Sequence, residues 1–254
     1  VEHADGLEAE LAGGQVDGIV LDLPEEVDGD VDIRVDNGYI DAQDLLADVR
    51  WADGDDTDGN GFVDKIYVGD LGGQMWRFGQ VTTDSAANPL SFPDCNENIQ
   101  SWVGQILFTA PTYVIDSTTY TRKFFYPPSV TLEKGYDLIF MGTGDRENAC
   151  DSTTAADRIY AVKDIHGTIT LTEANLVDVT DPAAAVPNLN STNGDVNLDG
   201  NYDQGWFIRL VDDFGVAEGE KVLAQGVVFY KTYYITTFTP NSDPCVPGGN
   251  ARLY

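Results

Sequence analysis

Residues 64–70 read Asp-Lys-Ile-Tyr-Val-Gly-Asp, and residues 157–164 read Asp-Arg-Ile-Tyr-Ala-Val-Lys-Asp. Each segment contains a basic residue, a branched apolar residue and a tyrosine in succession, and residues 251–254 (Ala-Arg-Leu-Tyr) repeat this order. The three tyrosines stand 93 and 94 residues apart (67 to 160 and 160 to 254), about twice the roughly 45 residues of a propeller blade. The repeat predicts an all-β protein of the β-propeller type. The alternative is that aromatic strands ending in Asp-Gly turns recur in any all-β protein.

The rest of the sequence also has the pattern of strands joined by loops. Short apolar runs are separated by stretches rich in Asp, Asn, Gly, Pro, Ser and Thr, which is typical of strands and turns. The predicted strands cover residues 18–23, 30–35, 65–69, 105–115, 123–126, 136–142, 158–163, 168–172, 205–211 and 225–238. We assign residues 1–52 to an N-terminal β segment, a candidate leading blade, and residues 53–254 to the propeller. Because the last repeat stops at its tyrosine, we expect a partial or small-bladed propeller from a longer protein.

The composition excludes some classes of function. The 254 residues contain 14 Lys+Arg against 43 Asp+Glu, a formal net charge of −29, so the phosphates of a nucleic acid would be repelled. Hydrophobic residues make up 42%, which is enough to bury a core and too many for a disordered acidic tail. No apolar run of about 18 residues is present, so we expect no membrane span. Thirty-two of the acids are Asp, a residue that favours turns and cation-binding loops.

One acidic loop has the spacing of a calcium site. Oxygen-bearing side chains stand at its positions one, three, five and nine, a glycine stands at six, and the seventh residue offers its backbone carbonyl. This is the first part of an EF-hand loop, in which alternate ligands of a tightly curled chain point at one centre. The predicted ligands are Asp56, Asp58, Asn60, the Phe62 carbonyl and Asp64. Three carboxylates this close repel one another unless a cation lies between them, and the flexible oxygen donors favour Ca²⁺ over Mg²⁺.

A second loop repeats the spacing, again with glycine at position six. Its predicted ligands are Asp195, Asn197, Asp199, the Asn201 carbonyl and Asp203. Both loops lack the bidentate glutamate that an EF-hand carries at position twelve, so they are EF-hand-like loops in a β protein, with one or two Ca²⁺ ions expected. The alternative for each is an acidic turn facing water. A third acidic run, residues 28–36, has isoleucine where the glycine is required, which favours an alternating edge strand.

The segment after the first loop carries a family resemblance. Residues 67–78 read Tyr-Val-Gly-Asp-Leu-Gly-Gly-Gln-Met-Trp-Arg-Phe, residues 138–144 end in Gly-Thr-Gly, and residues 205–245 begin with Gly-Trp-Phe-Ile-Arg-Leu and end in Asp-Pro-Cys. In this order the segments resemble the C-terminal β-propeller of the PilY family of type IV pilus tip proteins. The resemblance spans residues 53–254 and leaves the first ~50 residues unmatched.

The resemblance implies a secreted, calcium-binding part of a larger bacterial protein at the pilus tip or outer cell surface. It implies a role in pilus assembly, retraction control and adhesion. The implied partners are pilus components such as minor pilins, or a surface receptor. The family's calcium ligands correspond to the residues of the first loop, Asp56 to Asp64, whereas the second loop rests mainly on its own spacing.

Three cysteines, Cys95, Cys150 and Cys245, match no zinc spacing. Only two of them can pair within the chain, and a disulfide is expected in an exported protein. Whether Cys150 pairs with Cys245 or with Cys95 stays open.

The sequence favours a binding module over an enzyme. Its two histidines, His3 and His166, lie near no nucleophile motif, and no phosphate or dinucleotide fingerprint is present. The main alternative is a fragment of a quinone-dependent, calcium-requiring propeller dehydrogenase, which would need a basic or aromatic cradle for its cofactor. The other alternative is a carbohydrate-binding propeller whose surface is lined by Trp51, Trp76, Trp102 and Trp206. Tryptophans near glycine turns more often pack between blades, however.

Overall fold

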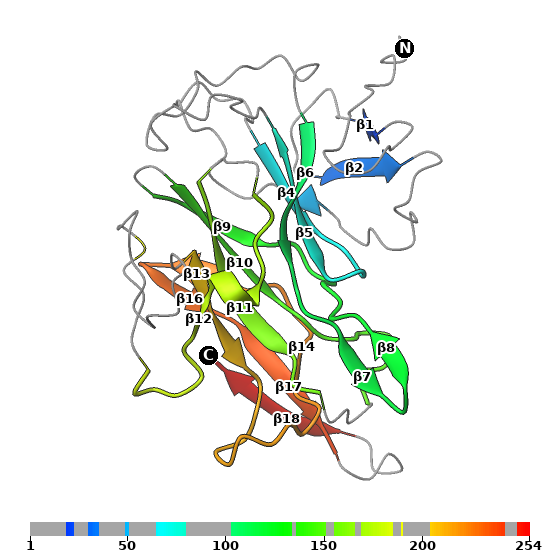
Figure 1. The fold of residues 1–254 in the computed structure, drawn as a ribbon, viewed down its shortest axis with the longest axis vertical. Coiled ribbons are helices and arrows are strands. Elements are labelled where there is room, and N and C mark those ends of the chain that lie inside the picture. The colour runs from blue at the N-terminus through cyan, green and yellow to red at the C-terminus, as the bar shows by residue number, and fades with distance from the viewer. Residues whose placement is uncertain are drawn as a thin grey trace.

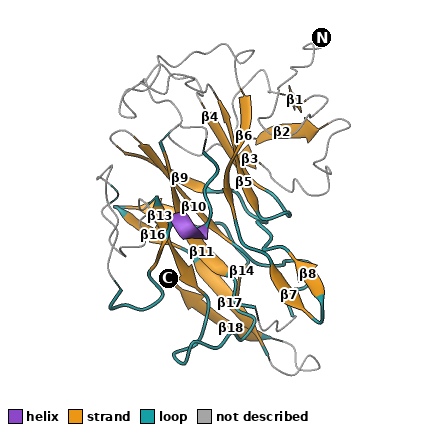
Figure 2. Ribbon diagram, in the orientation of Figure 1, coloured by secondary structure: helices purple, strands orange, loops and turns teal. Residues whose placement is uncertain are grey.

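The structure of the chain is a computed structural model. It describes the backbone of residues 19–22, 30–35 and 49–50, and then residues 65–79, 103–133, 136–150, 155–165, 169–184, 189, 204–241 and 248–254. Strands dominate these residues (Figures 1 and 2). They are β1 (Ile19–Asp22), β2 (Asp30–Val35), β3 (Val49–Arg50), β4 (Lys65–Gly69), β5 (Gln74–Gly79), β6 (Val103–Thr109), β7 (Tyr113–Ile115), β8 (Thr118–Tyr120), β9 (Ser129–Glu133), β10 (Tyr136–Gly142), β11 (Arg158–Asp164), β12 (Val177–Asp178), β13 (Gly205–Arg209), β14 (Lys221–Val222), β15 (Val227–Phe229), β16 (Thr232–Tyr234), β17 (Thr236–Pro240) and β18 (Gly249–Leu253). A single 3-10 turn, η2 (Glu173–Asn175), is the one helical element in the described ranges. The predicted all-β class is confirmed.

The central sheet has the strand order of a propeller blade. β9, β10, β11 and β13 pair antiparallel in chain order, and β12 joins the outer edge parallel to β13. A four-stranded antiparallel meander is the unit of a propeller. The sheet β4-β5-β6 lies above it in Figure 1, and the sheet β14-β17-β18 lies below it. A small sheet β1-β2-β3 and the hairpins β7-β8 and β15-β16 complete the described strands.

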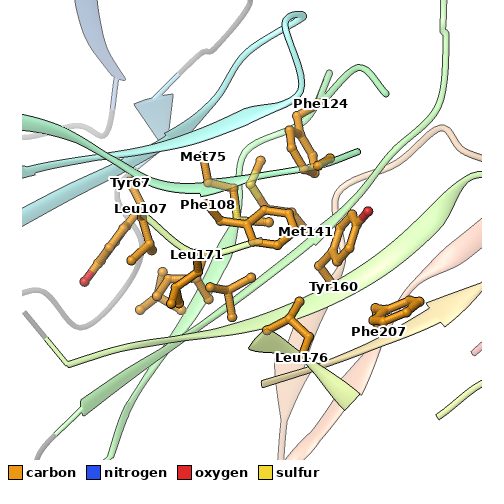
Figure 3. Close-up of a cluster of buried hydrophobic side chains, with 14 residues drawn as sticks. Tyr67, Met75, Leu107, Phe108, Phe124, Met141, Tyr160, Leu171, Leu176 and Phe207 are labelled. Carbon is orange, nitrogen blue, oxygen red and sulfur yellow. The ribbon is translucent and has the colours of Figure 1, made fainter. Parts of the chain in front are cut away.

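Both faces of the central sheet are covered, as expected of a blade between two others. All seven residues of β10 and all seven of β11 are buried, which suits their near-continuous apolar sequences. One face packs against the β4-β5-β6 sheet through the cluster shown in Figure 3. That cluster includes Tyr67, Met75, Leu107, Phe108, Phe124, Met141, Tyr160, Leu171, Leu176 and Phe207. The other face carries Leu138, Phe140 and Ala161, against which Val228 and Tyr233 of the β15-β16 hairpin pack.

Several predicted strands have the observed bounds and others do not. Residues 65–69 and 136–142 form β4 and β10 as expected. The segment 105–115 is divided between β6 and β7 around Pro111, and 225–238 contains a hairpin before β17. Residues 123–126 form no strand, and within 169–172 only a bridge from Leu171 to Phe108 is present. Pro111 interrupts the predicted strand at residues 105–115 because proline has no backbone N–H to donate to a strand ladder.

The tyrosine repeat does not mark equivalent places in successive blades. The first copy forms β4, at one side of its three-stranded sheet, whereas the second forms β11, in the interior of the five-stranded sheet. The interval of 93 residues is therefore not a period of two blades among the described strands. Instead Tyr67 and Tyr160 belong to the same apolar cluster, so the two similar segments face one common core.

Candidate functional site

The predicted calcium ligands lie outside the residues that the structure describes. They are Asp56, Asp58, Asn60, Phe62, Asp64, Asp195, Asn197, Asp199, Asn201 and Asp203. The residues that directly follow each loop are described, namely Lys65 after the first and Gln204 after the second. The surroundings of these two residues define where each loop joins the sheets.

Lys65, the first residue after the first loop, is fixed to the central sheet. Its side chain is 7% exposed, and its Nζ lies 2.5 Å from Oδ2 of Asp137, a fully buried residue of β10. An ammonium group is costly to bury unless a carboxylate compensates its charge. The pair therefore fastens the start of β4 to the start of β10, two strands of different sheets.

Tyr67 links Asp137 to a second buried carboxylate. Its phenol oxygen lies 2.8 Å from Oδ2 of Asp137 and 2.8 Å from Oδ2 of Asp164 at the end of β11. The phenol has one proton, so it can donate to only one of the two carboxylates at a time. The two acids face each other in the β10-β11 register, and the phenol lies between them.

Arg77 of β5 completes this cluster, which we call the inter-blade network (Lys65, Tyr67, Arg77, Gln105, Asp137 and Asp164). Its Nη1 donates to Oδ1 of Asp164 at 2.6 Å, and its Nη2 donates to Oε1 of Gln105 at 2.8 Å. Burial disfavours the guanidinium charge, but Asp164, Tyr67 and Asp137 together outweigh it and raise the pKa of Arg77 above its usual value. Two cations and two carboxylates thus balance one another in the interior.

The chain that leaves the second loop reaches the same end of the central sheet. Gln204 donates from its N–H to the carbonyl of Asn175 at 2.7 Å, and its own carbonyl accepts from the N–H of Lys163 at 2.8 Å. Lys163 immediately precedes Asp164 of the inter-blade network. At Gly205, which has a φ of +138°, a Cβ atom would lie 2.0 Å from the carbonyl oxygen of Ala161, so only glycine fits this approach. Both predicted loops therefore join the sheets beside the same buried carboxylates.

Asp70, the aspartate of the family motif at residues 67–78, stabilises a turn. Oδ1 of Asp70 accepts from the N–H of Gln74 and Oδ2 accepts from the indole N–H of Trp76, each at 2.8 Å. Gly73 supplies the positive φ, +83°, that the turn between β4 and β5 requires. The expected Asp-Gly turn is thus present here, and Trp76, 5% exposed, is a packing residue. The corresponding turn predicted after Asp164, toward Gly167, falls partly outside the described residues and stays a prediction. Asp164 itself, at the end of β11, is buried and accepts from Arg77.

The Gly-Thr-Gly segment brings two blades into close contact. A Cβ on Gly142 would lie 2.3 Å from the Val222 side chain, and one on Gly144 would lie 2.8 Å from the Lys221 side chain. Between them Thr143 is buried, and its carbonyl accepts from the N–H of Val222 at 3.0 Å. The motif is therefore a packing element between the central sheet and β14.

The 3-10 turn η2 is tied to the central sheet through Glu173. Its Oε1 accepts from the Tyr160 phenol at 2.6 Å and from Nε of Arg158 at 3.1 Å. Burial, together with the charge of Glu173, raises the pKa of Tyr160 well above its usual value. Tyr160 therefore remains a hydrogen-bond donor across the working pH range.

The other predicted site features are only partly described. Cys150 is exposed and forms no disulfide with another described residue. Cys95 and Cys245 lie outside the described residues, so a pairing of Cys150 with either of them stays a prediction. Trp206 is partly buried and packs edge-on against Phe140 at 6.2 Å, as expected for a blade-packing residue. Among the described residues no group of three or more His, Cys, Asp or Glu is placed to hold a metal ion. The same residues include no helix long and apolar enough to cross a membrane.

Sequence reasoning did not find the inter-blade network. The available signal was that Asp137, Lys65 and Arg77 stand inside or beside apolar strands, where an isolated charge requires a buried partner. The sequence does not show which charge meets which, because the partners lie 72 and 87 residues apart.

Comparisons with known proteins agree with this architecture. Residues 20–181 match the family model described as the PilY1 beta-propeller domain. The type IV pilus biogenesis factor PilY1 of Pseudomonas aeruginosa PAO1 is 28% identical over 233 residues, covering 78% of this chain and 19% of that protein. The protein of the same name from strain UCBPP-PA14 is 25% identical over 240 residues, covering 78% and 20%. The crystal structure of the P. aeruginosa PilY1 C-terminal domain matches 73% of this chain and 43% of that one, with 21% identity and a TM-score of 0.47.

The fold and the match to the family model define a protein of the β-propeller class. More narrowly, the chain belongs to the family of PilY1 β-propeller domains, because the family model covers more than half of it. The match begins at residue 20, inside the segment 1–52 that the sequence motifs left unmatched, and ends at residue 181. The division at residues 52 and 53 stays a prediction. The chain spans about a fifth of the length of the curated relatives it matches.

Proposed function

We propose that this chain is a calcium-binding module of a surface-exposed, pilus-associated protein that acts by binding and assembly in type IV pilus biogenesis and adhesion. Membership of the PilY1 β-propeller family supports the link to the pilus, since the similar curated proteins are titled type IV pilus biogenesis factors. Minor pilins or a surface receptor are the proposed partners, and the outer cell surface is the proposed location.

The observation that supports the calcium proposal is the way both acidic loops join the sheets. Of the residues that follow the loops, Lys65 is paired with Asp137, and Gln204 is hydrogen-bonded to the backbone of Lys163, the residue before Asp164. A fixed end reduces the conformational entropy that a loop loses when it closes on an ion. The donors of each loop are carboxylate, amide and carbonyl oxygens, the set that Ca²⁺ prefers. Such a loop would bind Ca²⁺ without help from other described residues.

Calcium removal tests this proposal. A ligand that binds only the folded chain stabilises it by about 2.7 kcal/mol at a concentration of 100 Kd, so millimolar Ca²⁺ should raise the thermal midpoint relative to a chelator. Asp58→Ala, which deletes a predicted ligand of the first loop, should abolish most of the gain. Asp36→Ala is the matched control, because it removes an Asp from the acidic run that lacks the required glycine. Equal melting curves in chelator and Ca²⁺, or equal losses in the two variants, would contradict the proposal.

The role in assembly is tested separately from the metal. Purified minor pilins should bind the immobilised chain in a biosensor assay, and Asp58→Ala should weaken that binding if the first loop shapes the contact surface. We expect the purified protein to show no absorbance in the quinone region, which separates this proposal from the dehydrogenase alternative. A bound chromophore, or binding to sugars in place of pilins, would contradict a role in pilus assembly.

A further inference from the structure

Arg122 follows the β7-β8 hairpin, which projects from the larger sheets in Figure 1. Its side chain is buried, and the residue is 6% exposed. Arg77 and Arg158, the other buried arginines of the described ranges, each form an ion pair with a carboxylate. Arg122 forms no such pair with a described residue. Because a buried cation without a counter-charge is unfavourable, Arg122 is a position where a negative charge is missing.

The guanidinium of Arg122 is held in place by the backbone on two sides. Its Nε donates to the carbonyl of Ala156 at 3.1 Å, and its Nη1 donates to the carbonyl of Pro111. The group lies over the ring of Tyr113, with 5.2 Å between Cζ and the ring centroid. Its Nη2 donates to no described residue and is not among the enclosed atoms that lack a partner. The Nη2 side of a fixed guanidinium is therefore accessible.

The acids that act on Arg122 through their charge, Glu173 and Asp157, are engaged elsewhere. Glu173 accepts from Nε of Arg158 at 3.1 Å. Asp157 accepts from the hydroxyl of Thr143 at 2.8 Å, and burial raises the pKa of its carboxyl. Neither carboxylate lies within ion-pair distance of Arg122, so the protein's described acids do not supply its counter-charge.

The surroundings of Arg122 favour a further negative charge. Arg158 donates from Nη1 to the same Ala156 carbonyl, at 2.5 Å, so two guanidinium groups share one acceptor. Asp157 lies in the field of three cations, which are Lys221, Arg122 and Arg158. Burial and the charge of Arg158 lower the pKa of Arg122 below its usual value. This part of the molecule is thus locally cationic, although the chain as a whole carries −29.

We propose that Arg122 binds the carboxylate group of a small ligand, between the β7-β8 hairpin and the start of β11. One carboxylate oxygen would accept from Nη2 in a charge-assisted hydrogen bond. Tyr113 stacks on Tyr120 at 5.5 Å, and Tyr120 is 44% exposed. An aromatic group attached to the carboxylate would therefore have a ring surface to pack against.

The net charge of the chain favours a ligand with a single charge. An acidic peptide or a nucleic acid would bring many negative charges to a protein of −29, which repels them. A monocarboxylate brings one, and the cations around Arg122 compensate it. One charge-assisted hydrogen bond and one aromatic contact hold a ligand weakly, so we expect a Kd of roughly 1–10 mM. The ligand class is a monocarboxylate with an aromatic body.

An NMR titration of the purified chain with N-acetylphenylalanine tests the site, in chelator so that the result is independent of calcium. The Nε–Hε signal of Arg122, identified by its absence in Arg122→Lys, should shift as the acid binds. N-acetylphenylalaninamide has the same body without the charge. It should bind at least about tenfold more weakly, because hydrogen bonds between charged groups are the stronger ones. This comparison uses the unaltered chain and does not depend on the folding of a variant.

Two variants separate Arg122 from the other arginines. Arg122→Gln removes the charge and should weaken binding of the acid by at least about tenfold. Arg146→Gln is the matched control with unchanged binding, because Arg146 also lies over a ring, that of Tyr126 at 5.9 Å, but is exposed.

Three results would overturn the carboxylate site. The first is an equal response of the Arg122 signal to the acid and to the amide. The second is binding of the acid that a folded Arg122→Gln chain retains, or that Arg146→Gln loses to the same extent. The third is an Arg122 signal that does not respond to the acid, which would show that the Nη2 side is closed to ligands.

Discussion

Arg77 and Lys65 carry charges in the interior, and their carboxylate partners explain why this is tolerated. Arg77 is 1% exposed and Asp164 is 1% exposed, so neither is solvated by bulk water. A complete buried pair adds little net stability, whereas removal of one partner leaves an uncompensated charge. The inter-blade network therefore selects one arrangement of the blades more than it adds to the free energy of unfolding.

Removal of one carboxylate should show this asymmetry. Asp164→Asn leaves Arg77 buried without its counter-charge and should lower the free energy of unfolding by about 3–5 kcal/mol, measured by urea denaturation. The control is Asp178→Asn, whose partner Arg209 is 45% exposed in a pair of 2.9 Å. That change should cost less than about 1 kcal/mol because water screens the pair. Similar losses in both variants would contradict a buried role for the network.

At the scale of strands, the blades meet where glycine removes all side-chain bulk. The Gly142–Thr143–Gly144 segment lets β14 approach the central sheet so closely that Val222 fills the place of a Cβ. Gly142 does not have a positive φ, so its requirement is for space alone. Val222 is in turn buried with Ile159, Leu210 and Ile235.

Gly142→Ala should therefore destabilise the protein by about 1–3 kcal/mol through overpacking. Val222→Ala removes the two γ-carbons that clash with the new methyl group and leaves only the contact with Cβ. In the double variant the combined loss should therefore be smaller than the sum of the two single losses by at least about 0.5 kcal/mol. Chemical denaturation of the four proteins gives this coupling. Strict additivity would mean that the two residues do not compete for the same space.

The elements that sequence reasoning predicted correctly are those with strong local signals. β4, β10 and β11 have near-continuous apolar sequences, and the turn at Asp70 and Gly73 has characteristic residues. The hairpins β7-β8 and β15-β16 were missed because their two-residue turns, Asp116-Ser117 and Tyr230-Lys231, have positive φ at non-glycine residues. Such turns are usually recognised by Asn-Gly or Gly-Gly. The inter-blade network was missed because its contacts depend on tertiary packing, and the calcium loops stay predictions.

At the scale of the whole molecule, the excess of acid determines how the protein responds to its solution. With a net charge of −29, the acidic side chains repel one another in the compact state. Salt at about 0.15 M screens charges that lie more than about 8 Å apart. The buried pairs of the inter-blade network are screened much less. Added salt should therefore weaken mainly the repulsion among surface charges.

In chelator, the thermal midpoint should rise as NaCl is increased from 10 to 500 mM. A gain of about 1 kcal/mol corresponds to about 2–4 °C for a domain of this size. An equal rise with KCl would show that screening, and not specific binding of Na⁺, is responsible. A midpoint that falls or stays constant with salt would contradict repulsion among surface acids as a cost to folding.

The long separation between the partners of the inter-blade network also has a consequence for synthesis. Asp164 follows Arg77 by 87 residues, and Asp137 follows Lys65 by 72. At about 5–20 residues per second, a ribosome needs roughly 4–17 s to extend the chain from Arg77 to Asp164. During that interval the β4-β5-β6 sheet has neither its counter-charges nor the other half of its apolar core. The nascent chain therefore presents an incomplete, aggregation-prone surface until the central blade emerges.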